Sequence, residues 1–117
     1  MNREKKYQTP ETIIIHSKGD KKMQVKVHYI SLLKAYTNKS QDEFVFPNNI
    51  LISELLDKIA ELYDKKFSQE VYDPKKKELK ATFVAMVNGV LIDQLKGINT
   101  TLKDGDSVIL MALMTGG

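Results

Sequence analysis

The sequence contains no cysteine, which excludes disulfide bonds, thiolate metal sites and cysteine nucleophiles. It also has no apolar run close to the roughly 20 residues that a membrane-spanning helix needs. The first residues, MNREKKYQTPET, lack the apolar segment of a signal peptide. Together, these absences predict a cytoplasmic protein with no membrane partner.

Histidines and clustered glycines are also scarce. Neither His16 nor His28 has a nearby pair of carboxylates at the spacing of metal ligands, and we expect His28 on the outer side of a strand. The GxxxxGK motif of phosphate-binding loops does not occur, because Gly89, Gly97 and Gly105 are isolated. We therefore expect no metal site, no bound cofactor and no catalytic residues in this chain.

With 117 residues, 42% hydrophobic and 28% charged, the chain has the size and composition of one globular domain. The net charge of +3 arises at one end, since residues 1–26 carry seven basic and three acidic side chains. The remaining residues carry eleven basic and twelve acidic ones, whereas a nucleic-acid-binding domain needs a basic stripe on its folded face. We therefore expect no nucleic-acid partner.

Alternation of apolar and polar residues predicts several β-strands. The first two are close in sequence and should pair antiparallel, while a later pair is joined by the preferred hairpin turn Asn88-Gly89. A further β-rich stretch, Thr12 to Ile15, could add an extra strand. The main predicted strands are MQVKVHYI (23–30), EFVFP (43–47), ATFVAMV (81–87), VLI (90–92) and VILMALM (108–114).

Residues 49–67 have the period of an amphipathic helix, with apolar side chains at every third or fourth position and charged ones between them. Residues 68–80 read as a polar connector around Asp73-Pro74. The resulting order of two strands, one helix and three strands predicts an α+β fold, in which one main helix covers a mixed sheet of four to five strands. The apolar stripe of the helix consists of Ile52, Leu55, Leu56, Ile59, Leu62 and Tyr63.

The last predicted strand is apolar on both faces, which is typical of a central strand in a sheet covered on both sides. A single helix covers only one side, so the other should bind a partner protein. The alternative is that the N-terminal segment folds over this side. The residues that we expect at the partner interface are Ile30, Ile109, Met111, Leu113 and Met114.

The order ββαβββ with one helix is that of the β-grasp, and the sequence resembles the ubiquitin-like sulfur carriers of the MoaD and ThiS type. The long connector before ATFVAMVNG is similar to the molybdopterin type (MoaD) rather than the thiamine type (ThiS). One departure is the absence of the prolines that molybdopterin-type carriers often have before the tail, where this chain has Met111 to Met114. The resemblance rests on VKVHYISLLK (25–34), ISELLDKIAELY (52–63), VNGVLI (87–92) and LKDGDSVILMALMTGG (102–117).

The resemblance does not include residues 1–20, which the charged start and the β-rich stretch predict to be a flexible or extra-strand N-terminal extension. Residues 21–117 would then be a β-grasp sulfur-carrier domain with a free Gly-Gly tail. Thr115 and Gly116 would form the thin part of the tail, and Gly117 would carry the sulfur. An E1-like adenylating enzyme would convert the Gly117 carboxylate to an acyl-adenylate, and a sulfur donor would convert that to a thiocarboxylate.

The second implied partner is the large subunit of molybdopterin synthase, which would use the thiocarboxylate. In this interpretation the chain is a carrier without an active site of its own. Three alternatives stay open: a thiamine-pathway carrier, a ubiquitin-like protein modifier, and a β-grasp binding module whose tail is dispensable.

The turn before the last strand contains Asp104 and Asp106, on either side of Gly105. Aspartate is favoured in tight turns on conformational grounds alone. The alternative is that the two carboxylates contact a basic patch on the activating enzyme.

Overall fold

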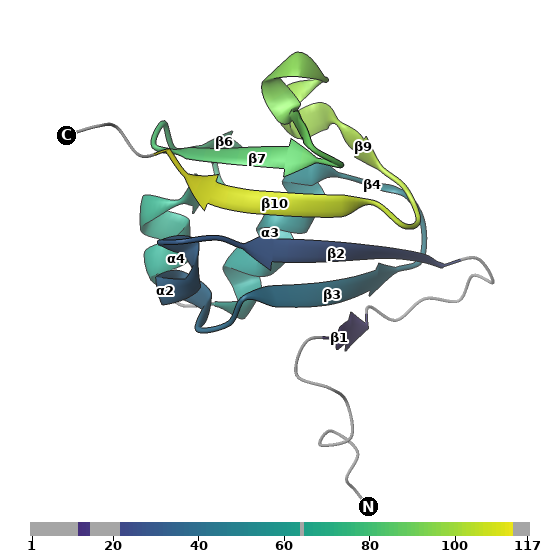
Figure 1. The fold of residues 1–117 in the computed structure, drawn as a ribbon, viewed down its shortest axis with the longest axis horizontal. Coiled ribbons are helices and arrows are strands. Elements are labelled where there is room, and N and C mark those ends of the chain that lie inside the picture. The colour runs from purple at the N-terminus through teal and green to yellow at the C-terminus, as the bar shows by residue number, and fades with distance from the viewer. Residues whose placement is uncertain (1–11, 15–21, 64, 114–117) are drawn as a thin grey trace, which may run out of the picture.

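A mixed sheet of six strands forms one layer of the fold in the computed structural model, which describes residues 12–14, 22–63 and 65–113. The strand order is β1-β3-β2-β10-β7-β8 (Figure 1). The two central strands, β2 and β10, are parallel, and β3 and β7 flank them antiparallel. The strands are β1 (Thr12–Ile14), β2 (Met23–Tyr29), β3 (Gln41–Phe46), β7 (Phe83–Val87), β8 (Val90–Leu91) and β10 (Ser107–Ala112).

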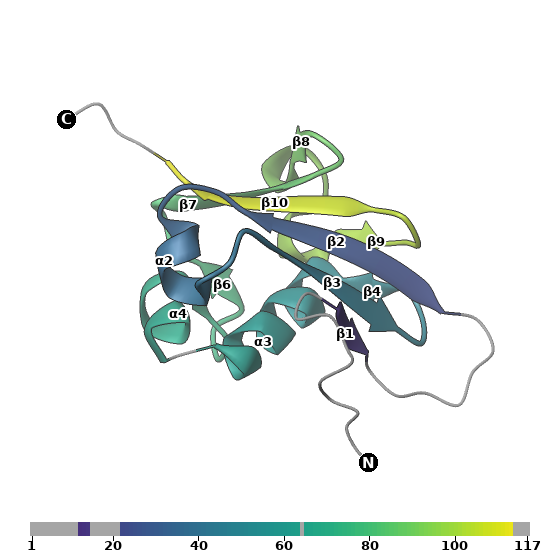
Figure 2. The same ribbon diagram turned by 60° about the horizontal axis from the view of Figure 1, so that its bottom comes forward.

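The second layer is helical and lies on one side of the sheet (Figure 2). Its main element is α3 (Ile52–Leu62), and the shorter α2 (Leu33–Thr37) and α4 (Lys65–Glu70) lie at one end of it. The Glu54 carboxylate accepts a hydrogen bond of 2.8 Å from the Leu51 N–H, which satisfies a backbone donor at the start of α3. This arrangement is the predicted α+β β-grasp.

The core lies between these two layers and is built by the alternation of the strands. In β2, the residues at odd positions from Met23 to Tyr29 are buried, and in β10 Val108, Leu110 and Ala112 are buried. The stripe of α3 packs against them, and each such aliphatic side chain stabilises the fold by about 1.5–3 kcal/mol on burial. The buried residues of α3 are Ile52, Ser53, Leu55, Leu56 and Ile59.

The predicted hairpin turn is confirmed. Asn88 and Gly89 have φ values of 51° and 85°, as a two-residue turn of type I′ requires, and Val87 pairs with Val90 across it. Two small ladders complete the structure, between β4 (Ile50–Leu51) and β9 (Thr101–Leu102), and between β5 (Tyr72–Asp73) and β6 (Glu78–Leu79).

The structure differs from the sequence-based expectation in the region after α3. The helix expected over residues 49–67 is divided into α3 and α4, and the expected polar connector contains the rest of α4 and the β5–β6 hairpin. Phe67, Val71 and Tyr72 in this region are fully buried. Because these apolar residues stand isolated among charged ones, they give no periodic signal. Leu62, expected in the helical stripe, is 44% exposed because α3 ends there.

The N-terminal stretch that could add a strand does so at the edge of the sheet. Strand β1 pairs in parallel with β3, Thr12 opposite Glu43 and Ile14 opposite Val45. It therefore extends the sheet on the side away from β10. Residues 1–11 and 15–21 lie outside the described part of the chain.

Candidate functional site

The candidate site is the end of β10, from which the C-terminal residues continue. β10 is paired on both sides, with β2 from Ser107 to Leu110 and with β7 from Val108 to Ala112. The ladder extends one residue further, because the Leu113 N–H donates a hydrogen bond of 2.6 Å to the Thr82 carbonyl. The last described residue is thus held by the sheet. Met114, Thr115, Gly116 and Gly117, which the sequence analysis assigned to the interface and tail, lie outside the described residues.

The two faces of β10 differ in burial. Val108, Leu110 and Ala112 face the helices and are buried, whereas Ile109 and Met111 are half-buried and Leu113 is 50% exposed. Two apolar faces on one strand therefore serve different purposes in this chain. One belongs to the core, and the other is left partly open.

Further apolar residues extend this open face. Ile30 is 37% exposed and lies beside the end of β10, because its N–H donates to the Leu110 carbonyl at 3.0 Å. On the other side of β10, Val84 lies opposite Met111 and Met86 opposite Ile109, and both are half-buried. We call the combined surface the outer patch, and it consists of Ile30, Val84, Met86, Leu91, Ile109, Met111 and Leu113.

The sequence analysis placed Ile30, Ile109, Met111 and Leu113 together, and the structure brings these four to one region of the sheet. It missed Val84, Met86 and Leu91. The signal for the first two was available, since FVAMV puts Val84 and Met86 on the face opposite Phe83, Ala85 and Val87. Leu91 follows from the hairpin register, in which it pairs with Met86.

The outer patch has a polar border on the β2–β3 side. There, the Lys26 ammonium lies 3.9 Å from the Glu43 carboxylate, and the Gln24 side chain donates to the same carboxylate at 3.2 Å. His28, in β2, is half-buried and pairs with Ile109. The outer patch therefore ends at these polar side chains of β2 and β3.

A groove of about 670 Å³ adjoins the outer patch along β7. The groove overlaps the outer patch and begins where the tail leaves the sheet, and the residues common to both are Val84, Met86, Leu91, Met111 and Leu113. Its other lining residues are 77–81, 83, 85, 92–93 and 97–98. This volume is within the range of ligand and peptide pockets in proteins.

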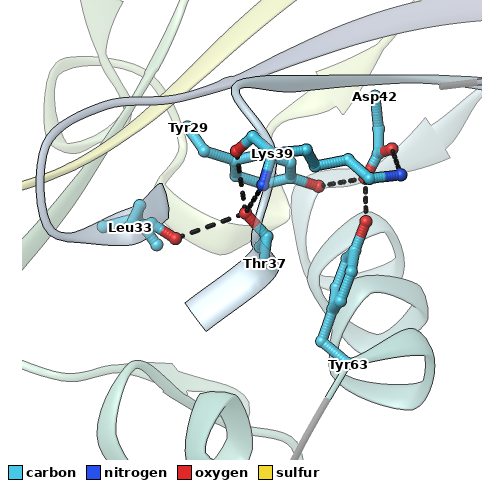
Figure 3. A network of polar contacts seen from close by, with 6 residues as sticks. All are labelled: Tyr29, Leu33, Thr37, Lys39, Asp42 and Tyr63. Atoms are coloured by element: carbon cyan, nitrogen blue, oxygen red, sulfur yellow. Dashed lines mark hydrogen bonds and ion pairs between the residues drawn. The ribbon is translucent and has the colours of Figure 1, made fainter. Parts of the chain in front are cut away.

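A buried carboxylate braces the same end of the sheet (Figure 3). Asp42 accepts hydrogen bonds from the Tyr29 hydroxyl at 2.8 Å, the Tyr63 hydroxyl at 2.5 Å and the Lys39 ammonium at 2.9 Å. These groups come from β2, from the residue after α3 and from the loop before β3, respectively. The network therefore ties the helix to the sheet near the tail, since Tyr29 pairs with Leu110 of β10.

Burial and the Asp42 carboxylate both affect the tyrosines of this network. Burial, followed by the negative charge of Asp42, raises the pKa of Tyr29 well above its usual range. Burial and the hydrogen bond to Asp42 likewise raise the pKa of Tyr63. Both hydroxyls thus stay protonated at neutral pH and act as donors. We assign the network a structural role because all three donors are directed at the Asp42 carboxylate.

The aspartates of the last turn are occupied by the fold at the opposite end of β10. Asp104 accepts a hydrogen bond of 2.8 Å from the Gln24 N–H. Asp106 accepts one of 2.8 Å from the Lys103 N–H and one of 2.9 Å from the Asn88 side chain. These contacts favour the conformational interpretation of the two residues over a contact with an enzyme.

Within the described residues, no group of three or more histidine, aspartate and glutamate side chains is arranged to hold a metal ion. None of the helices formed by residues 22–63 and 65–113 is long and apolar enough to cross a membrane.

Comparison with known families places this site in context. The model of the ThiS family matches residues 27–117, which include the end of β2, all of α3 and β10, and the tail. The chain belongs to the ThiS family. It is therefore a ubiquitin-like protein of the ThiS/MoaD sulfur-carrier type, as the sequence resemblance implied.

Solved structures share the fold of this ThiS-family chain. The Haloferax volcanii HVO 2177 protein is 20% identical, with a TM-score of 0.69 over 87% of this chain and 94% of that one. Small archaeal modifier protein 1 from Methanosarcina acetivorans is 20% identical, with a TM-score of 0.66 over 83% and 99%. A putative molybdopterin converting factor, subunit 1, from Pyrococcus furiosus is 25% identical, with a TM-score of 0.63 over 79% and 99%. No curated protein sequence matches the chain.

Proposed function

We propose that this chain is the sulfur-carrying small subunit of a molybdopterin synthase. The observation that carries the proposal is the ThiS-family match, which runs to Gly117 and includes the tail that β10 holds at its base. The chain acts as a cosubstrate, and the catalytic groups belong to its partners.

The chemistry takes place at the Gly117 carboxylate. An adenylating enzyme joins this carboxylate to the AMP part of ATP and releases pyrophosphate, so that AMP becomes the leaving group that a bare carboxylate lacks. Sulfide delivered by a sulfur donor then attacks the carbonyl carbon of the acyl-adenylate, the bond to AMP breaks, and a thiocarboxylate remains. Gly116 and Gly117 suit a narrow channel because they have no side chains.

The outer patch supplies the docking surface for the adenylating enzyme and for the synthase large subunit. Its methionines, Met86 and Met111, suit a surface that packs against two different proteins, because their side chains are flexible and polarisable. Interfaces in general bury such apolar centres inside a polar rim. The Lys26–Glu43 border described above provides such a rim on one side.

Mass spectrometry of the intact protein tests the carrier chemistry. After incubation with the adenylating enzyme, ATP and a sulfur donor, we expect the mass change of one oxygen-to-sulfur exchange at Gly117. A variant truncated after Thr115 is the control and should show no change. If conjugates to lysines of other proteins form instead, the chain is a protein modifier.

The modifier function is the second candidate, and the similarity to small archaeal modifier protein 1 favours it. For the molybdopterin pathway, the support is the long connector of residues 68–80 and the similarity to the Pyrococcus furiosus protein. Complementation of carrier-deficient strains separates the pathways. Rescue of thiamine synthesis alone would contradict the molybdopterin assignment.

A further inference from the structure

The groove along β7 begins at the tail. Leu113 is the last described residue and forms part of the groove wall, so residues 114–117 start at its rim. The wall also contains apolar side chains, among them Leu79, Phe83 and Leu91. The groove therefore offers an apolar surface next to a segment that begins with Met114.

The groove lies where the sheet has an open edge. β8 pairs only with Met86 and Val87, so among the described strands Phe83, Val84 and Ala85 pair with β10 alone. An open strand edge beside an apolar groove is the kind of surface on which extended segments bind.

The two lysines of the groove differ in their ionic partners. Lys77 lies 2.6 Å from the Asp57 carboxylate, whereas Lys80 forms no contact ion pair within the described part of the chain and its positive charge acts on the Asp73 carboxylate only at longer range. The exposed carboxylates of Glu78 and Asp93 also line the groove and repel an anion. A carboxylate that enters the groove is therefore attracted only where it approaches Lys80.

Lys80 lies close to the base of the tail. Its carbonyl accepts a hydrogen bond of 3.0 Å from the Phe83 N–H, and the intervening Thr82 carbonyl accepts the one from Leu113. The far side of β7 is about 10 Å from β10, which corresponds to two strand spacings. Four residues extend up to about 13 Å, so the tail is long enough to cross β7.

We propose that the groove along β7 binds the chain's own tail, with Met114 against the apolar wall and the Gly117 carboxylate beside Lys80. The inference rests on the proposed function, because it takes the Gly117 carboxylate as the group that carries the sulfur. Because Val84, Met86, Leu91, Met111 and Leu113 belong to both the groove and the outer patch, a partner that covers the patch displaces the tail. The groove thus withholds the carboxylate until an enzyme has docked.

A spin label on the tail tests this arrangement in the full chain. The sequence has no cysteine, so Thr115→Cys provides a unique attachment site. We expect the label to broaden the NMR amide signals of Leu91 and Ile98 in the groove, and to leave that of Glu43 on the opposite edge sharp. Broadening confined to Leu113 and its sequence neighbours overturns the proposal.

A charge reversal tests the role of Lys80. In Lys80→Glu, we expect the ratio of docked to free tail to fall about twofold to fivefold, the range that exposed ion pairs give. Lys75→Glu is the matched control, because Lys75 is an exposed lysine of the same hairpin that does not line the groove. Equal broadening in Lys80→Glu and in the unaltered chain contradicts the assignment.

A mixed sample identifies the copy to which the tail binds. If a spin-labelled copy broadens the groove signals of a separate, isotope-labelled copy, the occupant is a second molecule and the proposal is wrong. The NMR readout needs no enzyme. If the groove signals broaden but no sulfur is added at Gly117, the proposed function is refuted and the binding of the tail in the groove is still supported.

Discussion

At the scale of single residues, Asp42 determines how the tail end of the sheet is held. Both tyrosine hydroxyls donate to its Oδ2 atom, and the Lys39 ammonium approaches its Oδ1 atom. The side chain is fully buried, so no water replaces a lost partner. A carboxylate accepts all three bonds, whereas an amide offers one oxygen only.

We therefore expect Asp42→Asn to lower the free energy of unfolding by about 1–3 kcal/mol, the cost of leaving a buried polar group unpaired. Urea denaturation measures this change. Glu61→Gln is the control: Glu61 is exposed and pairs with Lys58 at 3.0 Å, so its loss should cost less than about 1 kcal/mol. Equal losses in the two variants would show that the network contributes no more than a surface ion pair.

The sequence predicts residues whose role depends on their neighbours and misses those that depend on distant ones. Asn88-Gly89 is readable because the turn needs only two successive residues with positive φ. Asp42 is not, because its partners Tyr29 and Tyr63 lie 13 and 21 residues away. Its polar side chain also gives no reason to begin the predicted strand EFVFP one residue earlier, or to expect residue 42 in the core.

At the scale of elements, the region between α3 and β7 is the largest departure from the expectation. α4 and the β5–β6 hairpin place Phe67, Val71 and Tyr72 in the core, and the Tyr72 hydroxyl donates to Asp57 at 3.0 Å. Lys77 closes the same region through its 2.6 Å contact with Asp57. This segment therefore has a charged, exposed face and an apolar face that is buried in the core.

We expect Phe67→Ala to lower the free energy of unfolding by about 3–5 kcal/mol, because Phe67 is fully buried and its removal leaves a cavity. Thermal or urea unfolding measures the loss. Gln69→Ala, at an exposed position of the same short helix, should change stability by less than about 0.5 kcal/mol. A small loss for Phe67→Ala would show that α4 is peripheral.

Elements with a regular pattern were predictable, because burial on one face imposes a period on the sequence. The helix of residues 52–62 and the four longer strands of the sheet follow from the 3.6 and two-residue periods. The short elements α2 and α4 do not, since one or two buried residues each are too few to define a period.

At the scale of the whole molecule, the helices cover one side of the sheet and the outer patch lies on the other. We expect Met111→Glu to weaken binding to the synthase large subunit by tenfold or more. Burial of such a side chain is worth about 1.5–3 kcal/mol, and each ~1.4 kcal/mol is one decade in affinity. Stability should change little, because Met111 is only half-buried.

The experiment pairs a binding titration with thermal unfolding. Thr101→Glu, at an exposed position of β9 outside the outer patch, is the control and should affect neither. Unchanged binding of Met111→Glu together with a collapsed melting temperature would show that Met111 belongs to the core.

The position of the outer patch was predictable to this extent: an apolar residue at every position of 108–113 requires cover on both sides, and one helix supplies one cover. The groove was not, because it is formed by the β5–β6 hairpin and by the segment after β8, whose arrangement depends on the core beneath them.

The parallel pairing of β2 and β10 has a mechanical consequence. β2 begins at one end of the sheet and β10 ends at the other, so tension applied between Met23 and the tail slides these two strands past each other. Their hydrogen bonds are then loaded together in shear, and they do not open one at a time. When force is applied to the tail, the hydrogen bonds between β2 and β10 therefore resist most strongly at the start, before any strand has been released.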